Sequence, residues 1–195
     1  MDAKKEDRRV QRTRNMLMDA FIDLMIQKGY EAITVQDVID RANVGRSTFY
    51  SHFADKEQLL VASINQLGDF LKEQSRNRSL PEGAQKEYQF GFSLAMLQHV
   101  QSAKRIFKAT MGEKGGSFVL SHMRRMLADL TRDEIQALLP PAATLSIPQE
   151  VLIDFILNTL LILLTWWLEN DTPCSAAEVD RMFHQLILNG LSSFR

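Results

Sequence analysis

The side chains best suited to recognition chemistry fall in one short run of the sequence, between Gly45 and Phe53. An arginine can donate two parallel hydrogen bonds to a guanine edge, and hydroxyl groups can reach base edges, phosphates or a thymine methyl. Tyrosine and histidine are long enough to bond phosphate oxygens. The residues in this run that carry these groups are Arg46, Ser47, Thr48, Tyr50 and His52. Taken together, they indicate contact with DNA.

Each of these side chains also has a plainer interpretation. A single arginine is more often a solvated surface residue than a base reader, and Tyr50 or His52 could pack against a neighbouring helix. Whether these side chains contact DNA or only lie on the surface depends on the helices that position them. Helical periodicity predicts three such elements, over residues 8–28, 34–42 and 45–52.

The second and third of these helices are short, and a tight turn at Asn43 and Val44 joins them. Asparagine tolerates the left-handed backbone that such a turn needs. Phe49 and Phe53 mark the buried side of the third helix, which leaves the polar residues on its outer side and edges. Two short helices after a longer supporting helix describe a helix-turn-helix, over about residues 34–53.

Two flanking positions could hold DNA phosphates. Thr34 caps the second helix, whose positive N-terminal end can bind an anion. Lys56 lies at the start of a fourth helix, where Asp55 and Gln58 have the spacing of a capping box, and it could clamp the DNA backbone. The capping role of Thr34 is compatible with a phosphate contact.

Three segments of the sequence resemble the helix-turn-helix of the TetR/AcrR family of bacterial transcriptional regulators. They are Thr34–Val38, Ala42–Phe53 and Asp55–Leu60. The similarity covers roughly residues 11–71. The chain departs from the family's commonest pattern at Asn43, where glycine is usual, and at Gly45, where serine is frequent.

The resemblance implies a homodimer that binds an operator of two-fold character, usually as a repressor that a small ligand releases. By position, it makes Thr34 and Lys56 phosphate anchors. It also implies that six residues contact bases or the DNA backbone: Gln36, Arg46, Ser47, Thr48, Tyr50 and His52.

Basic residues outnumber acidic ones at the start of the chain. The basic residues are Lys4, Lys5, Arg8, Arg9, Arg12 and Arg14, and the acidic ones are Asp2, Glu6 and Asp7. Such an arm can lie along phosphates or a minor groove, or it can be a solvated tail. Arg12 and Arg14, nearest the first helix, are the two for which a DNA contact is expected.

Composition limits the remaining choices. The 195 residues are 45% apolar and 24% charged with a net charge of -1, values that exclude a disordered chain, a fibre and a uniformly basic nucleic-acid binder. The single cysteine, Cys174, allows no intramolecular disulfide and fits a reducing compartment. With no signal-type segment at the N-terminus, the expected location is the cytoplasm.

Beyond a polar, turn-forming stretch at residues 76–83, no strand-type alternation of useful length is present. Apolar periodicity predicts five further helices, over residues 84–101, 103–111, 118–139, 148–169 and 176–194. The predicted fold class is all-α. A three-helix DNA-binding domain at residues 11–71 precedes a larger helical ligand-binding and dimerisation domain at residues 76–195.

The segment Val151–Leu168 is apolar enough to suggest a membrane span. It carries Asp154 and Asn158, is near the lower length limit for crossing a bilayer, and has no flanking basic cluster. We therefore expect a helix buried in protein, with no membrane as partner.

The C-terminal part is rich in methionine and phenylalanine, which suit an adaptable pocket for an apolar or amphipathic effector. The candidate lining residues are Phe92, Met96, Phe107, Met111, Phe118, Met123 and Met126. Taken singly, each of them is more often an ordinary core residue than a pocket residue. Arg105, His99 and His122 are possible polar anchors, and nothing in the sequence distinguishes them.

The last two helices carry more apolar surface than a chain of this size needs to cover. A homodimer interface is one interpretation and an intramolecular core is the other. The candidate interface residues are Trp167, Phe183, Leu186, Ile187 and Gly190. A glycine inside a helix fits close approach of another helix, because it otherwise weakens the helix by about 1 kcal/mol relative to alanine.

An enzyme is a weaker interpretation. Cys174 has no histidine near it in sequence, and the histidines lack the close spacing of a common metal site. The glycines around Lys114 follow no strand, and their spacing does not match a phosphate-binding loop. We expect no catalytic residue, no metal and no cofactor.

The sequence thus favours a homodimeric DNA-binding repressor released by a small apolar or amphipathic ligand. The alternative is a DNA-bound dimer that acts through protein partners without sensing a small molecule.

Overall fold

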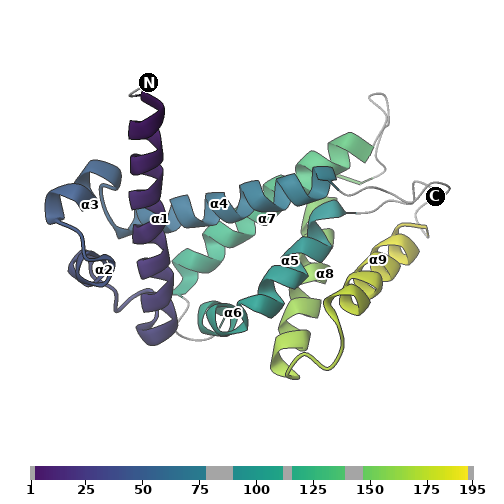
Figure 1. The fold of residues 1–195 in the computed structure, drawn as a ribbon. Helices are drawn as coiled ribbons and strands as arrows, with labels where there is room; N and C mark the ends of the chain where they lie inside the picture. Colours follow the sequence, from purple (N-terminus) through teal and green to yellow (C-terminus); the bar gives the residue numbers. More distant parts are fainter. Residues whose placement is uncertain (1–2, 78–89, 112–115, 139–146, 193–195) are drawn as a thin grey trace. The chain divides into compact units, whose positions relative to one another are not determined.

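The computed structural model describes residues 3–77, 90–111, 116–138 and 147–192 of the chain. These ranges hold nine helices and no strand (Figure 1), which confirms the predicted all-α fold class. The helices are α1 (Ala3–Lys28), α2 (Val35–Ala42), α3 (Arg46–His52), α4 (Lys56–Asn77), α5 (Gly91–Ser102), α6 (Lys104–Met111), α7 (Gly116–Leu138), α8 (Gln149–Glu169) and α9 (Ala176–Ser192).

Most helix ends lie within a few residues of the expected positions. Helix α1 begins at Ala3 rather than Arg8, so the basic N-terminal residues continue the helix instead of preceding it. Helix α5 begins at Gly91, and residues 84–89 of the expected helix lie outside the described residues. The same holds for residues 78–83 of the turn-forming stretch and for residues 193–194 at the end of the last expected helix.

The chain forms two compact units. One unit contains residues Met1–Gln66 and Arg105–His122, and the other contains Leu67–Lys104 and Met123–Arg195. Nearly all of α6 and the first turns of α7 belong to the first unit. The expected domain boundary between residues 71 and 76 stays a prediction. Helices α4 and α7 each run without a break from one unit into the other.

Helices α1, α2 and α3 form the helix-turn-helix part of the first unit. Helix α1 ends at Gly29, whose φ of 77° lies in the left-handed region that favours glycine. Asn43 ends α2 with φ 51° and ψ 51°, the left-handed turn that the sequence indicated. Phe49 is 0% exposed and Phe53 is 1% exposed, so the predicted buried side of α3 is confirmed.

In the second unit, α9 packs against α5 and α8. Helix α8 is long and apolar enough to cross a membrane by length and composition alone. Eight of its residues are nevertheless buried within the protein. Its polar residues Asp154 and Asn158 are exposed and accept hydrogen bonds from Arg124 of α7, Asp154 Oδ1 from Nη2 and Asn158 Oδ1 from Nη1, each at 3.0 Å. The buried residues are those of a helix that packs inside a folded unit, as expected from the sequence.

The N-terminus of α5 is held by side chains from α7 and α9. The Phe90 N–H donates to Nε2 of His184 at 2.9 Å. The Gly91 and Phe92 N–H groups donate to the Glu134 carboxylate at 2.8 and 3.3 Å, and the Ser75 hydroxyl donates to the same carboxylate at 2.5 Å. Since the first N–H groups of a helix have no partner within it, Glu134 and His184 supply what the helix lacks.

Gly91 also permits a close approach between α5 and α4. A Cβ atom at this position would lie 3.0 Å from Cα of Ser75, closer than side chains normally come to a backbone atom. A glycine is therefore needed where the two helices meet.

We predict that Glu134→Ala destabilises the protein by about 2 kcal/mol, because it leaves two backbone N–H groups and a hydroxyl without a carboxylate partner. Urea unfolding followed by circular dichroism measures this change. Asp133→Ala is the matched control, since the ion pair of the neighbouring Asp133 with Lys72, at 2.9 Å, is exposed. The control is expected to change stability by less than about 0.5 kcal/mol. Equal effects of the two substitutions would contradict the capping role of Glu134.

Candidate nucleic-acid interface

Helix α3 presents a polar face to solvent. Arg46, Ser47 and Tyr50 are exposed, while Thr48 and His52 are half-buried. The opposite side of the helix is fixed by the buried rings of Phe49 and Phe53, whose centroids lie 6.2 Å apart. The five residues expected to reach DNA therefore lie on one short helix, on the side and edges away from its packing surface.

Arg46 is tied to α2 by a polar chain. Its Nη2 donates to Oε1 of Gln36 at 3.1 Å, and Nε2 of Gln36 donates to Oδ1 of Asp40 at 2.8 Å. Two residues expected to contact DNA thus contact each other, and the bond orients the guanidinium along the α2–α3 junction. A guanidinium carries five N–H donors, so this single bond leaves donors that can still read a base edge.

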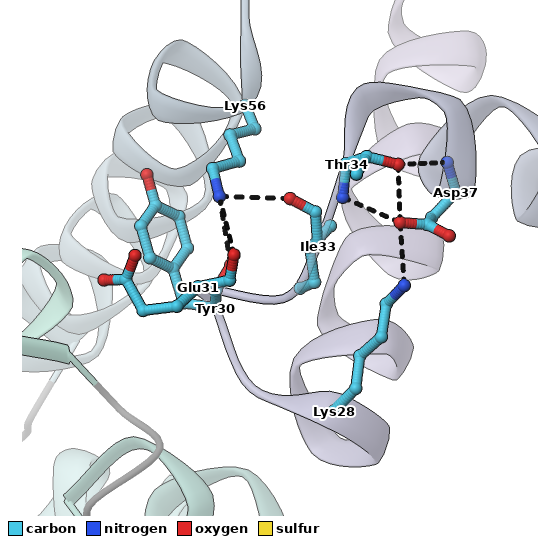
Figure 2. Close-up of polar contacts among 7 residues, drawn as sticks. All are labelled: Lys28, Tyr30, Glu31, Ile33, Thr34, Asp37 and Lys56. Carbon is cyan, nitrogen blue, oxygen red and sulfur yellow. Dashed lines mark hydrogen bonds and ion pairs between the residues drawn. The ribbon is translucent and has the colours of Figure 1, made fainter.

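Thr34 caps α2, as expected, through a reciprocal pair with Asp37 (Figure 2). The Asp37 N–H donates to the Thr34 hydroxyl oxygen at 3.2 Å. The Thr34 N–H and hydroxyl donate to Oδ2 of Asp37 at 2.7 and 2.6 Å, and Nζ of Lys28 lies 2.7 Å from the same oxygen. The donors of Thr34 are therefore used within the chain, and its role as a phosphate anchor stays a prediction.

The pKa of the Asp37 carboxyl lies far below its usual range. The largest cause is the hydrogen bond from Lys28, followed by the bonds from the Thr34 hydroxyl and N–H. The carboxylate consequently stays ionised and meets the positive end of α2, where a phosphate was expected from the sequence.

Lys56 has a structural role that the sequence did not reveal (Figure 2). Its ammonium donates to three backbone carbonyls of the α1–α2 turn, those of Tyr30, Glu31 and Ile33, at 3.2, 3.4 and 3.0 Å. The same ammonium lies 4.5 Å from the centroid of the Tyr30 ring. Because an ammonium has only three N–H donors, this geometry occupies all of them. Its assignment as a phosphate anchor stays a prediction.

Tyr30 stands at the centre of this turn and was not singled out from the sequence. Its ring stacks on Phe118 with centroids 5.7 Å apart and meets Phe21 edge-on at 6.3 Å. Its hydroxyl is buried and has no hydrogen-bond partner among the described residues. Burial, with smaller contributions from Glu57, Glu31 and Asp55, raises the pKa of Tyr30 to about 12, so the phenol stays neutral.

Arg14 is also used within the first unit. Its Nη1 donates to the backbone carbonyl of His52 at 3.2 Å, and its guanidinium lies 4.5 Å from the centroid of the Phe53 ring. Arg14 therefore joins α1 to the C-terminal end of α3. Arg12, the other basic residue expected to contact DNA, is exposed.

The candidate effector residues do not gather in one unit. Phe107, Met111 and Phe118 belong to the first unit, and the remaining four to the second. Those four are Phe92 and Met96, both deeply buried, Met126, at 9% exposure, and Met123, which is half-buried. The side chain of Met111 lies outside the described residues. The pocket assignment stays a prediction.

The three suggested polar anchors also differ in their surroundings. Arg105 is exposed, and His122 lies against Phe118 with ring centroids 4.3 Å apart. His99 is half-buried, and burial lowers its pKa.

The structure places three of the candidate dimer residues inside the second unit. Trp167, Phe183 and Ile187 are 0% exposed, and Nε1 of Trp167 donates to the Cys174 carbonyl at 2.8 Å. Leu186 is 52% exposed, while the surroundings of Gly190 lie outside the described residues. Trp167, Phe183 and Ile187 therefore belong to the intramolecular core of this unit. The sequence could not show this, because the packed side of each helix is as apolar as its outer side.

A different set of apolar side chains on α8 and α9 faces solvent. The exposed members are Val151, Phe155, Ile162, Trp166, Met182 and Leu186. An open groove of about 510 Å³ lies on α8, lined by Asn158, Leu161, Ile162, Thr165, Trp166 and Glu169. Leu186 is one of the residues expected at the dimer interface.

Two short helices, α2 and α3, joined by a left-handed turn at Asn43 and packed on the longer α1, have the arrangement of a helix-turn-helix. The sequence model of bacterial regulatory proteins of the tetR family matches residues 17–63, and that of a transcriptional regulator C-terminal region matches residues 87–189. The chain belongs to the TetR family of DNA-binding transcriptional regulators.

Individual relatives agree with this family. The uncharacterized HTH-type transcriptional regulator YxbF of Bacillus subtilis is 47% identical over 62 residues, which are 31% of this chain and 16% of that protein. The chain spans only 16 to 29% of the length of the first three curated relatives it matches.

Two solved structures share the fold over most of the chain. A TetR transcriptional regulator from Streptococcus agalactiae is 27% identical with a TM-score of 0.69, covering 95% of this chain and 99% of that one. FadR from Bacillus subtilis, in complex with stearoyl-CoA, is 16% identical with a TM-score of 0.59, covering 90% and 97%.

We predict that the contribution of Asp37 to stability depends on pH. A carboxyl with a lowered pKa stabilises the folded state fully above its unfolded pKa of about 3.9 and loses this effect as the pH falls toward the folded value. The gap in unfolding free energy between the wild type and Asp37→Asn should therefore be constant above about pH 5 and shrink below about pH 4. Urea unfolding over a pH series measures it. Lys28→Gln should reduce the same dependence, and a gap that stays constant at all pH values would contradict the mechanism.

We predict that Lys56→Gln lowers the melting temperature, because three carbonyls lose their shared donor. If the ammonium stays on these carbonyls when DNA is bound, the slope of the logarithm of DNA affinity against the logarithm of salt concentration is unchanged. A phosphate contact would instead lower that slope by about 0.9 per subunit. Fluorescence anisotropy on an operator duplex selected from random-sequence DNA measures the slope. Lys108→Gln, which removes one positive charge from the surface of the first unit, is the comparison for a change in net charge.

Proposed function

We propose that this TetR-family regulator is a cytoplasmic homodimeric repressor that a small apolar or amphipathic ligand releases from its operator. The observation that carries the proposal is the exposed polar face of α3, held outward by the burial of Phe49 and Phe53. A second copy of this helix in a dimer would reach a second half-site of the same operator.

Within each half-site, Arg46, Ser47 and Thr48 are proposed to contact base edges in the major groove. Their side chains supply a forked donor and two short hydroxyls at the N-terminal end of α3, the part of a recognition helix that reaches base edges. Gln36, Tyr50 and His52 would contact bases or phosphates around them. The bond between Arg46 and Gln36 orients the guanidinium before DNA is bound, which favours binding by reducing its entropic cost.

The proposed dimer interface is the exposed apolar face of α8 and α9. Phe155, Ile162 and Trp166 recur along one side of α8 at helical spacing, and Met182 and Leu186 are one turn apart on α9. Large apolar side chains exposed in this way mark an interaction surface, and a two-fold dimer can cover a face with its own copy. This proposal moves the interface from the buried Trp167, Phe183 and Ile187 to the outer side of the same helices.

The proposed effector is apolar because the candidate lining residues are phenylalanines and methionines. FadR of Bacillus subtilis, which has the same fold, is in complex with stearoyl-CoA, a ligand with a long apolar chain. We therefore take long-chain acyl compounds as the first class of ligand to test.

The test begins with an operator duplex selected from random-sequence DNA by the wild-type protein. Arg46→Ala combined with Tyr50→Ala is expected to abolish retardation of this duplex while leaving the oligomeric state unchanged. Arg125→Ala, an exposed arginine of α7 in the second unit, is the control and should bind normally. Unchanged binding by the double variant would overturn the assignment of α3 as the reading helix.

Dimerisation and release are tested on the same protein. Ile162→Glu should yield monomers by light scattering, whereas Leu120→Glu, at an exposed leucine of α7, should remain dimeric. An acyl-CoA series should raise the melting temperature and release the operator if the C-terminal half senses such ligands. Dimers of Ile162→Glu would overturn the proposed interface, and stabilisation without release would overturn the repressor mechanism.

A further inference from the structure

The polar chain between α2 and α3 ends at Asp40, an acidic residue of the helix-turn-helix. Nη2 of Arg46 donates to Oε1 of Gln36 at 3.1 Å, and Nε2 of Gln36 donates to Oδ1 of Asp40 at 2.8 Å. All three residues are exposed, so solvent or a bound molecule can reach each of them. We propose that Asp40 is a positioning residue for base recognition, which acts through the Gln36 amide to hold Arg46 in place for a guanine.

The chemistry of the three groups permits one orientation of the Gln36 amide. An ionised carboxylate only accepts hydrogen bonds, and a guanidinium only donates them. Turning the amide by half a rotation would bring its oxygen against the carboxylate and its NH2 group against the guanidinium, so both bonds would be lost. Asp40 therefore fixes the amide from one end, and the amide oxygen points to Arg46 at the other end.

Helix α2 supplies a fixed base for this chain. Gln36 and Asp40 are four residues apart, a spacing that puts their side chains on the same face in successive turns. Val38, Ile39 and Ala42 are buried and form the packed side of the helix, which fixes its rotation. The bond between Gln36 and Asp40 thus starts from a backbone that cannot turn.

The position of Asp40 is unfavourable for the helix that carries it. Asp40 lies in the last turn of α2, where the negative end of the helix dipole favours a cation and opposes a carboxylate. No basic side chain in the described ranges forms an ion pair with it. Neither the helix dipole nor an ion pair accounts for an aspartate at this position, whereas the bond to Gln36 does.

A carboxylate at this site should favour one DNA sequence over others. Its charge repels the phosphates of any duplex, so it weakens DNA binding in general. Its hold on Arg46, acting through Gln36, helps only a duplex that presents a guanine to the guanidinium. Asp40 should therefore raise specificity while it lowers affinity for unrelated DNA.

This inference rests on the proposed reading of bases by Arg46 and names the residue that sets its selectivity. A guanidinium that is oriented before binding loses less conformational entropy when it meets the O6 and N7 atoms of guanine. Without Asp40, the Gln36 amide can turn and Arg46 is held less firmly. The expected loss at the guanine is that of one hydrogen bond, about threefold to tenfold in affinity.

The test uses the operator duplex selected by the wild-type full-length chain, with each guanine replaced in turn by 7-deazaguanine, which lacks the N7 acceptor. Fluorescence anisotropy at low salt measures the affinities, because phosphate contacts keep weaker variants bound there. The guanine that Arg46 reads is the one at which the replacement weakens the wild type but not Arg46→Ala. Asp40→Ala should reduce the effect of the replacement at that guanine by about threefold to tenfold and leave the other positions unchanged.

Two further measurements separate positioning from a general effect of charge or folding. Binding of Asp40→Ala to an unrelated duplex should be as tight as that of the wild type or tighter. In a variant that combines Asp40→Ala with Arg46→Ala, the loss of Asp40 should add nothing to the loss of Arg46, since the first acts through the second. Additive losses would overturn the proposal, because Asp40 would then act on the DNA without Arg46.

Asp23→Ala is the matched control. It removes an exposed carboxylate from the same unit, one whose ion pair at 2.6 Å is with Arg41 of α2 instead of with the polar chain. It should leave the guanine preference unchanged. Asp40→Asn keeps the shape of the side chain and guards against a folding defect in Asp40→Ala; it should also weaken the preference, but by less. A wild-type preference in both Asp40 variants, or an equal loss in Asp23→Ala, would overturn the proposal.

The outcome for Asp40 is separate from the outcome for Arg46. If one guanine depends on Arg46 and the Asp40 variants keep the full preference for it, Arg46 reads the base and the positioning role of Asp40 is rejected. If no guanine depends on Arg46, the proposed reading of bases by this arginine fails, and the role of Asp40 fails with it.

Discussion

The recognition helix has only seven residues, and an isolated helix of this length is not stable in water. Its existence depends on the burial of Phe49 and Phe53 against the rest of the first unit. Because these two rings must stay inside, the rotation of α3 about its own axis is fixed, and so is the set of side chains that can face a groove. Arg14 also helps to fix this rotation, because its guanidinium donates to the last carbonyl of α3 and lies over the Phe53 ring.

The turn between α1 and α2 is the second part of this support. The Lys56 ammonium donates hydrogen bonds to three carbonyls of the turn, and the Thr34–Asp37 pair caps α2 directly after it. An ammonium that serves carbonyls and a carboxylate that meets a helix N-terminus both satisfy backbone groups that would otherwise lack partners. The residues closest to the proposed DNA contacts thus include several that act on the backbone of the protein itself.

Local signals in the sequence were sufficient for much of this architecture. The left-handed turn at Asn43 and the buried sides of the short helices follow from residue type and spacing, and the structure contains them. The expected cap at the start of the fourth helix is present as well, with the Gln58 N–H donating to Oδ1 of Asp55 at 2.7 Å. Each of these features is decided by residues a few positions apart, which is why a single sequence can show it.

Contacts between residues far apart in the chain could not be predicted from the sequence in the same way. The carbonyl partners of Lys56 lie 23 to 26 positions away, and nothing about the lysine itself indicates them. Helix α8 illustrates a second limit, because it is apolar on nearly every side and periodicity cannot show which side is packed. Trp167 was therefore expected on a surface that Trp166 in fact occupies. The cap of α5 by Glu134 and His184 depends on two other helices and left no local pattern.

The adjacent tryptophans of α8 have an optical consequence. They are the two tryptophans of the sequence, and one is fully buried while the other is 40% exposed on the outer face of the same helix. Indole emission shifts with the polarity of its surroundings, so Trp167 should report the integrity of the core and Trp166 the covering of the outer face. The natural sequence therefore contains two neighbouring fluorescent probes, one sensitive to unfolding and the other to whatever covers α8.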